Sequence, residues 1–257
     1  MNRVAGLSAL LVDLEGTVSE DGRIVPGAAE ALAATSARGI AHCFVTNTTG
    51  RPRAAVAREL SQMGLDAPPE RIFTAPSAAS AYLESRGYTR CHLLVRPAVR
   101  EDFPGVEADE DAPQAVVLGD MGEETTFARL NRAFRNVLAG AELVTLARNR
   151  YWRAKDGLVL DVGAFAAALE YATGRSAHLV GKPSPEFFAA ALTFLGAAPE
   201  RTAVIGDDLE SDVAGAQAAG MRGILVRTGK FRASDLDGSA IRPDAVLDSL
   251  ADLPRLL

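Results

Sequence analysis

Acidic, hydroxyl and lysine residues follow four apolar runs of strand length in this chain. They are Asp13 and Glu15 after residues 7–12, Thr46 and Asn47 after 40–45, Lys182 after 178–180, and Asp207, Asp208 and Asp212 after 203–205. If the four runs are parallel strands of one sheet, these residues meet at its carboxyl edge, where ligands of open α/β sheets bind. The spacing therefore predicts one site built from four separate segments.

The chemistry of these side chains indicates a divalent cation beside a phosphate group. Magnesium prefers a few carboxylates together with substrate oxygens and water. Carboxylates gathered at one edge repel each other without such a cation, and a lysine and a hydroxyl can hold phosphate oxygens. Each residue alone has an ordinary explanation: Thr46, Asp208 and Asp212 could be helix N-caps, and Lys182 could lie on the surface.

The order of these motifs resembles that of the haloacid dehalogenase superfamily, whose phosphatases use an aspartate nucleophile. The matching segments are D-L-E-G-T at 13–17, T-N at 46–47, G-K-P at 181–183 and G-D-D-x-x-x-D at 206–212. The long insertion between the second and third motifs is similar to class IIA, the NagD-type and nitrophenylphosphatase-like enzymes with an α/β cap. Segments 160–163, 169–172, 181–188 and 227–232 resemble the subgroup of phospholysine phosphohistidine inorganic pyrophosphate phosphatases and their near relatives.

The resemblance implies a role for each candidate residue. Asp13 would attack phosphorus and form an aspartyl phosphate. Mg²⁺ would be held by the carboxylates of Asp13 and Asp207 and by the backbone carbonyl of Glu15. Thr46 and the backbone N–H of Asn47 would bind the phosphoryl group, and Lys182 would balance the charge between nucleophile and phosphate. Asp208 and Asp212 would support the metal and its waters.

Glu15 departs from the superfamily pattern. Its phosphatases commonly carry an aspartate two residues after the nucleophile, as general acid and then base, and relatives in this subgroup often carry serine. Glutamate keeps an ionisable carboxyl group but reaches about 1.5 Å further. General acid–base help is worth about 10²–10⁴ in rate, so we expect a slow enzyme or one restricted to substrates with good leaving groups.

The elements that must position these residues follow a βα alternation, which predicts an α/β fold. Helices are expected at 26–38, 52–63, 184–195, 212–219 and 249–256, between strands at 7–12, 40–45, 178–180, 203–205 and 223–226. This pattern predicts a doubly wound, Rossmann-like parallel sheet as the core.

The stretch between the second and third motifs is longer than a βα unit requires. It holds its own expected strands at 92–95, 115–118 and 143–146 and helices at 125–138 and 164–171. We therefore expect a smaller α/β cap domain at 76–177, inserted between core segments 1–75 and 178–257. Relatives of this class often pair through their caps, so a homodimer through the cap is expected.

Composition narrows the function classes. With 27 basic and 33 acidic residues the net charge is −6, which opposes binding to nucleic acid, and we expect no such partner. The apolar run at 7–12 is too short to span a membrane, so we expect no membrane partner and a cytoplasmic protein. We also expect the two cysteines, Cys43 and Cys91, to be buried and reduced. Only three residues, Lys155, Lys182 and Lys230, are lysines, which draws attention to each.

Two function classes remain at this stage. The leading prediction is a Mg²⁺-dependent phosphatase that acts on a small phosphorylated molecule: a phosphomonoester, pyrophosphate or phosphoramidate. The alternative is a catalytically weak phosphate-binding or regulatory protein in which Glu15 marks decayed chemistry. Asp13, Lys182 and Asp207, all present, favour the enzyme.

Overall fold

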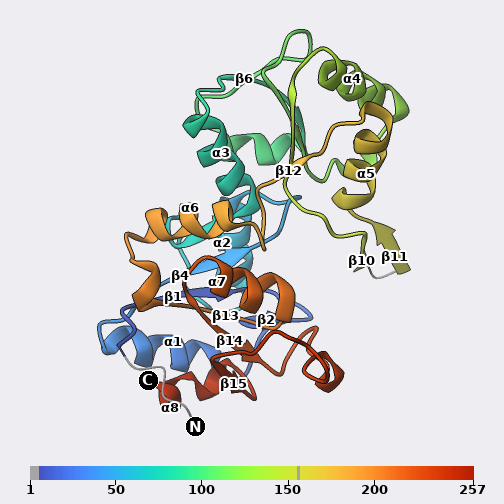
Figure 1. Ribbon diagram of the computed structural model, residues 1–257. Coiled ribbons are helices and arrows are strands. Elements are labelled where there is room, and N and C mark those ends of the chain that lie inside the picture. The colour runs from blue at the N-terminus through green and yellow to red at the C-terminus, as the bar shows by residue number, and fades with distance from the viewer. Residues whose placement is uncertain (1–5, 155–156) are drawn as a thin grey trace. The chain divides into compact units, whose positions relative to one another are not determined.

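The computed structural model describes residues 6–154 and 157–257. These residues form two compact units (Figure 1). Unit 1 comprises residues 6–46, 53–73 and 182–257, and unit 2 comprises 47–52 and 74–181, without the undescribed 155–156. The domain borders at 75 and 177 stay a prediction.

Unit 1 is built on a sheet that has six strands among the described residues, in the order β15-β14-β13-β1-β4-β5. Their bounds are β1 Ala9–Asp13, β4 Ala41–Thr46, β5 Ile72–Thr74, β13 Thr202–Gly206, β14 Arg222–Val226 and β15 Ala245–Leu247. The pairs from β15 through to β4 are parallel. Both β1 and β13 are buried along their whole length, as expected for strands covered on both faces.

Helices cover both faces of this sheet. Figure 1 shows α1 and α8 on one face and α6 and α7 on the other. The helices of unit 1 are α1 Ala28–Ala37, α2 Arg53–Gln62, α6 Pro185–Leu195, α7 Gly215–Ala218 and α8 Leu253–Leu256. Leu32, Leu60 and Leu253 pack on one face with alternate strand residues such as Leu10 and Val12. A short hairpin, β2 Ser19–Glu20 with β3 Arg23–Ile24, follows β1.

Unit 2 has a sheet of its own, in the order β12-β9-β8-β6-β7, with parallel pairing throughout. Its strands are β6 Arg90–Leu94, β7 Glu107–Ala108, β8 Ala115–Leu118, β9 Glu142–Thr145 and β12 His178–Leu179. Its helices are α3 Ala75–Ser85, α4 Phe127–Leu138 and α5 Val162–Thr173. An antiparallel hairpin, β10 Tyr151–Ala154 with β11 Gly157–Leu160, precedes α5.

The α/β class, the doubly wound parallel core and the α/β cap are confirmed, but individual elements need correction. The strand expected at 178–180 was assigned to the core sheet, which is wrong: His178 and Leu179 pair with Val144 and Thr145 of unit 2. Strands β5 and β15 were not predicted, because segments of three residues give no clear period. The helix expected at 212–219 begins earlier, as a π-helical turn at Leu209–Ala214 that continues into α7.

Two further predictions concern buried thiols and the membrane. Cys43 and Cys91 are both buried and free, as predicted. Among residues 6–154 and 157–257, no helix combines the length and apolar character that crossing a bilayer requires.

Candidate active site

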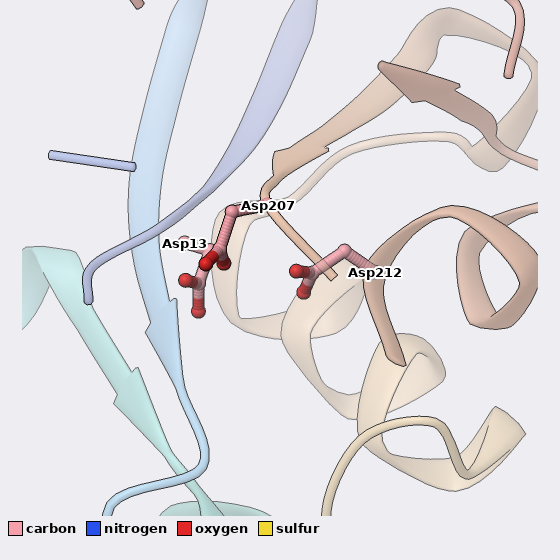
Figure 2. Close-up of side chains that lie close together, drawn as sticks. All are labelled: Asp13, Asp207 and Asp212. Carbon is pink, nitrogen blue, oxygen red and sulfur yellow. The ribbon is translucent and has the colours of Figure 1, made fainter. Parts of the chain in front are cut away.

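Three buried carboxylates meet at the carboxyl edge of the unit 1 sheet (Figure 2). Asp13 ends β1, Asp207 directly follows β13, and Asp212 lies on the π-helical turn. One carboxylate oxygen from each lies within 4.8 Å of the others. Asp13 and Asp207, which are 194 positions apart in the chain, therefore lie in one acidic cluster, because β1 and β13 are adjacent parallel strands.

Lys182 joins this cluster as its buried cation. Its Nζ donates to Asp13 Oδ1 at 2.5 Å and to Asp212 Oδ1 at 2.6 Å, and only 5% of the residue is exposed. A buried ammonium group is tolerated only when it is paired in this way. Lys182 therefore links the end of β1 to the turn that follows β13.

Asp208 shapes the turn that carries Asp212. Its Oδ1 accepts hydrogen bonds from the backbone N–H groups of Glu210 at 3.1 Å and Ser211 at 2.9 Å, which is the geometry of an N-cap. Its own N–H donates to Asp212 Oδ2 at 3.2 Å. Asp208 thus has the capping role that its residue type suggested, and through this bond it also holds Asp212.

Glycine is required where backbone approaches these carboxylates. A Cβ at Gly16 would lie 2.1 Å from Asp207 Oδ2, and one at Gly206 would lie 2.1 Å from Asp212 Oδ2. Gly16 also has a φ of 84°, which side chains rarely adopt. The glycines of D-L-E-G-T and G-D-D therefore leave the room that the carboxylates occupy.

Burial is the largest single influence on the pKa values of the clustered aspartates. Desolvation raises the pKa of Asp13, against the attraction of Lys182. Burial also raises the pKa values of Asp207 and Asp212, each to about 6. The pKa of Lys182, which burial alone would lower, is instead raised because Asp13 and Asp212 stabilise its charge.

The donor set fits a hard divalent cation. The three clustered side chains offer carboxylate oxygens, the type of ligand that Mg²⁺ prefers. Among the described residues, the buried Asp207 Oδ1 has no hydrogen-bond partner. When ionised, the four aspartates of this region carry four negative charges, and Lys182 and Lys230 carry two positive charges. One divalent cation neutralises the two negative charges that remain. The four aspartates are Asp13, Asp207, Asp208 and Asp212.

The other predicted site residues lie at or next to this edge of the sheet. Thr46 is buried at the end of β4, beside β1. Asn47 is the next residue in the chain and the first of unit 2. Glu15 is exposed in the turn after β1, where it forms a bridge with Ser19. Of the other two lysines, Lys155 lies outside the described residues, and Lys230 lies beside Asp208.

One contact to the cluster was missed from the sequence. The backbone N–H of Lys230 donates to Asp207 Oδ2 at 2.6 Å. A backbone donor carries no signature of residue type, so only the scarcity of lysine and the resemblance of segment 227–232 to the phosphatase subgroup pointed to this loop.

Comparison with known families and proteins gives consistent matches. The family model described as haloacid dehalogenase-like hydrolase matches residues 10–108, and a second, described as HAD-hydrolase-like, matches residues 179–253. Haloacid dehalogenase-like hydrolase domain-containing protein 2 of Bos taurus is 45% identical over 90% of this chain and 88% of its own length. The human phospholysine phosphohistidine inorganic pyrophosphate phosphatase is 37% identical over 99% of this chain and 96% of its own.

Solved structures agree with these sequence matches. The 4-nitrophenylphosphatase of Thermotoga maritima has a TM-score of 0.91 at 30% identity, covering 97% of this chain and 97% of that one. NagD of E. coli K-12 has a TM-score of 0.90 at 26% identity, covering 96% of this chain and 98% of that one.

Proposed function

We propose that this chain, which belongs to the haloacid dehalogenase-like hydrolase family and is a phosphatase, cleaves small phosphorylated molecules through an aspartyl phosphate on Asp13 with the help of Mg²⁺. The substrate class is a phosphomonoester, pyrophosphate or phosphoramidate. The observation that carries the proposal is the buried cluster of Asp13, Asp207 and Asp212 around Lys182. No structural purpose requires three acids and one lysine to be buried together, since such clusters cost stability.

The reaction begins with the carboxylate of Asp13. Lys182 holds its Oδ1, and the other carboxylate oxygen forms a bond to phosphorus as the bond from phosphorus to the leaving group breaks. Thr46 and the Asn47 N–H bind the phosphoryl oxygens. Water then attacks the aspartyl phosphate, which releases inorganic phosphate and restores the carboxylate.

Glu15 moves the proton in both steps of this proposal. Its carboxyl group gives a proton to the departing group, and the resulting carboxylate takes one from the attacking water. Its exposed position, two residues after Asp13, supports this role.

Asp13, Asp207 and the backbone carbonyl of Glu15 would hold Mg²⁺, with Asp208 and Asp212 in support. The bound ion would neutralise charge on the phosphoryl oxygens and the nucleophile. Without it, the acidic cluster would repel the substrate's own negative charge.

The test is a substrate panel with and without magnesium. It spans 4-nitrophenyl phosphate, pyrophosphate, sugar phosphates, nucleotides, pyridoxal phosphate and phosphoramidates. We expect turnover that disappears on exhaustive chelation and returns with Mg²⁺, and labelling of Asp13 by beryllofluoride. Full activity after chelation would remove the metal from the proposal, and labelling at another residue would remove Asp13 as nucleophile.

A catalytically weak phosphate-binding or regulatory protein is the competing function. It has less support, because buried charges such as those of Asp13 and Lys182 are costly to retain without a use. A protein that binds phosphate but turns over no member of the panel would favour it.

Two wider proposals accompany the activity. We propose a cytoplasmic location, supported by the two free, buried thiols. We also propose a homodimer that forms through unit 2, supported by the exposed apolar side chains of its β10–β11 hairpin.

A further inference from the structure

The loop Thr228–Lys230, which follows β14, contacts two parts of the candidate site. It reaches Asp207 through a backbone N–H, and it reaches the turn after β1 through the Thr228 hydroxyl. Neither the motifs nor the proposed reaction assigns this loop a role.

At Asp207 the loop occupies one of the two carboxylate oxygens. The Lys230 N–H donates to Oδ2 at 2.6 Å, whereas the buried Oδ1 has no hydrogen-bond partner within the described parts of the chain. The bond therefore fixes the rotation of the carboxylate about its terminal torsion, which is soft when unrestrained. The other carboxylate oxygen of Asp207, Oδ1, therefore stays available as a ligand within the acidic cluster.

At the other contact, Thr228 Oγ1 donates to the backbone carbonyl of Gly16 at 2.5 Å. Gly16 directly follows Glu15, whose backbone carbonyl is the third proposed metal ligand. The hydroxyl thus ties the loop to the segment that carries two ligands, Asp13 and Glu15. Fixing that segment fixes the distance between those ligands and Asp207.

Gly229 allows both contacts at once. Its φ is 63°, and a Cβ here would lie 2.1 Å from Asp207 Oδ2 and 2.4 Å from Gly16 Cα. The two loops are therefore in direct backbone contact, with no room for a side chain between them.

We propose that Thr228 is a positioning residue for the Mg²⁺ site, acting through the Gly16 carbonyl and, by way of the same loop, through Asp207. This inference depends on the proposed function, because it concerns the metal named there. The fold does not need this hydroxyl: β14 is already paired with β13 and β15, and the Arg227 N–H bonds to the Leu247 carbonyl. Loss of the hydroxyl should loosen the loop and leave the sheet intact.

The experiment compares Thr228→Val, which removes the hydroxyl at nearly constant shape, with Thr228→Ser, which keeps it. Thr202→Val is the matched control, because the buried Thr202 Oγ1 also donates to a backbone carbonyl of unit 1, that of Ala198, at 2.7 Å. Mg²⁺ binding to the substrate-free protein is measured by isothermal titration calorimetry. We expect Thr228→Val to raise the Kd for Mg²⁺ about 10- to 100-fold, the usual cost of losing a group that orients a ligand.

For Thr228→Ser and Thr202→Val, the Kd for Mg²⁺ should stay within about threefold of that of the unsubstituted protein. In turnover, Thr228→Val should recover most of its kcat at saturating Mg²⁺, since it alters positioning and not reacting groups. Thr228→Ala gives a second test without the hydroxyl should the valine variant not fold.

Two results would overturn the inference while leaving the proposed function standing. One is unchanged Mg²⁺ affinity in Thr228→Val or Thr228→Ala, and the other is an equal loss in Thr228→Ser. Absence of Mg²⁺ binding by the unsubstituted protein would instead overturn the proposed function itself.

Discussion

At the scale of single residues, the site depends on one ammonium group placed between two carboxylates. Lys182 Nζ reaches Asp13 and Asp212 at once, with distances of 2.5 and 2.6 Å. A compact ammonium group can sit between two acids in a small space, whereas a planar guanidinium needs a wider one. This explains why a chain with 27 basic residues and only three lysines has a lysine here.

Asp13→Asn tests the nucleophile. The amide is nearly isosteric but a poor nucleophile, so we expect turnover of 4-nitrophenyl phosphate to fall by about 10⁴-fold or more. Circular dichroism and the unfolding midpoint should show a retained fold. Asp66→Asn, the same change at an exposed position of unit 1, is the control and should keep full activity. Near-normal turnover of Asp13→Asn would exclude Asp13 as the nucleophile.

Glu15→Gln tests the general acid. We expect alkyl phosphates to slow by about 10²–10⁴-fold, because their leaving oxygen needs a proton. 4-Nitrophenyl phosphate should slow far less, since its leaving group needs little protonation. The rates are compared under conditions where formation of the aspartyl phosphate is limiting. Equal losses on both substrates would limit Glu15 to its backbone carbonyl.

The raised pKa values of Asp207 and Asp212, each about 6, predict a pH dependence of metal binding. Their ordinary pKa is 3.8, so between these two values the folded, metal-free protein holds protons that the unfolded chain has released. These protons stabilise the folded protein; the whole of this stabilisation is present below about pH 4, and it is lost as pH rises through about 6. Mg²⁺ must displace the same protons, so its affinity should weaken as pH falls below about 6.

Mg²⁺ titrations of the substrate-free protein at about pH 5 and about pH 7.5 check this expectation. The Mg²⁺-induced rise in unfolding midpoint should be smaller at the lower pH. A rise of equal size at both values would contradict the protonation of these carboxylates.

Side-chain chemistry allowed the residues of the acidic cluster to be predicted, because acids at strand ends form a recognisable pattern. The contact of the Lys230 N–H with Asp207 could not be predicted in this way. It depends on how two loops meet, and the residue type at a backbone donor carries no information about it.

At the scale of elements, strands and helices set the site by where they end. Strand β1 lies between β13 and β4, so Asp13, Asp207 and Thr46 emerge at neighbouring positions of one edge. Helix α6 begins just after Lys182, with Ser184 as its N-cap and Pro185 in its first turn. The buried side chains of Phe187 and Phe188 then fix the helix against unit 1.

Ser184→Ala tests this anchoring of α6. Ser184 Oγ accepts the Phe187 N–H at 3.1 Å, and its loss should lower the free energy of unfolding by about 1 kcal/mol. Chemical denaturation measures the change. Mg²⁺ affinity should stay unchanged, because the two aromatic side chains still hold the helix. Ser184→Thr keeps a capping hydroxyl and should be nearly neutral, so an equal loss in both variants would argue against the cap.

Long, periodic elements were predictable, but the partners of short ones were not. Strand β1, expected at 7–12, is found at Ala9–Asp13. By contrast, β12 has only two residues, and nothing in its sequence distinguishes a strand of the core sheet from one that pairs with β9. Its assignment to the core was wrong because tertiary pairing, not local pattern, decides it.

At the scale of the whole molecule, the acidic cluster and its lysine lie within one unit. Asp13, Lys182, Asp207 and Asp212 all belong to unit 1. Unit 2 has its own sheet and its own apolar cluster around Leu94, Leu118 and Val137. This separation allows sequence change in unit 2 without disturbing the acidic cluster.

Unit 2 also exposes apolar surface that the monomer leaves uncovered. On the β10–β11 hairpin, Tyr151, Leu158 and Leu160 are 58%, 60% and 64% exposed. Tyr151 faces Leu160 across the strands, and Leu158 lies two residues from Leu160, so all three side chains project from the same face. A contiguous apolar face of this kind marks an interaction surface. Trp152 and Val159, on the opposite face, are also partly exposed.

The proposed homodimer gives this hairpin a function, and Leu160→Glu tests it. Sedimentation equilibrium of the unsubstituted protein at micromolar concentration should give twice the chain mass of 27.0 kDa. A carboxylate introduced at Leu160 would have to be desolvated at the interface, so this variant should sediment as a monomer. Leu138→Glu, a change at an exposed leucine of α4 away from the hairpin, should leave the dimer intact. A monomeric unsubstituted protein, or a Leu160→Glu variant that still pairs, would refute the dimer or its location, because burial of this face is what the proposal requires.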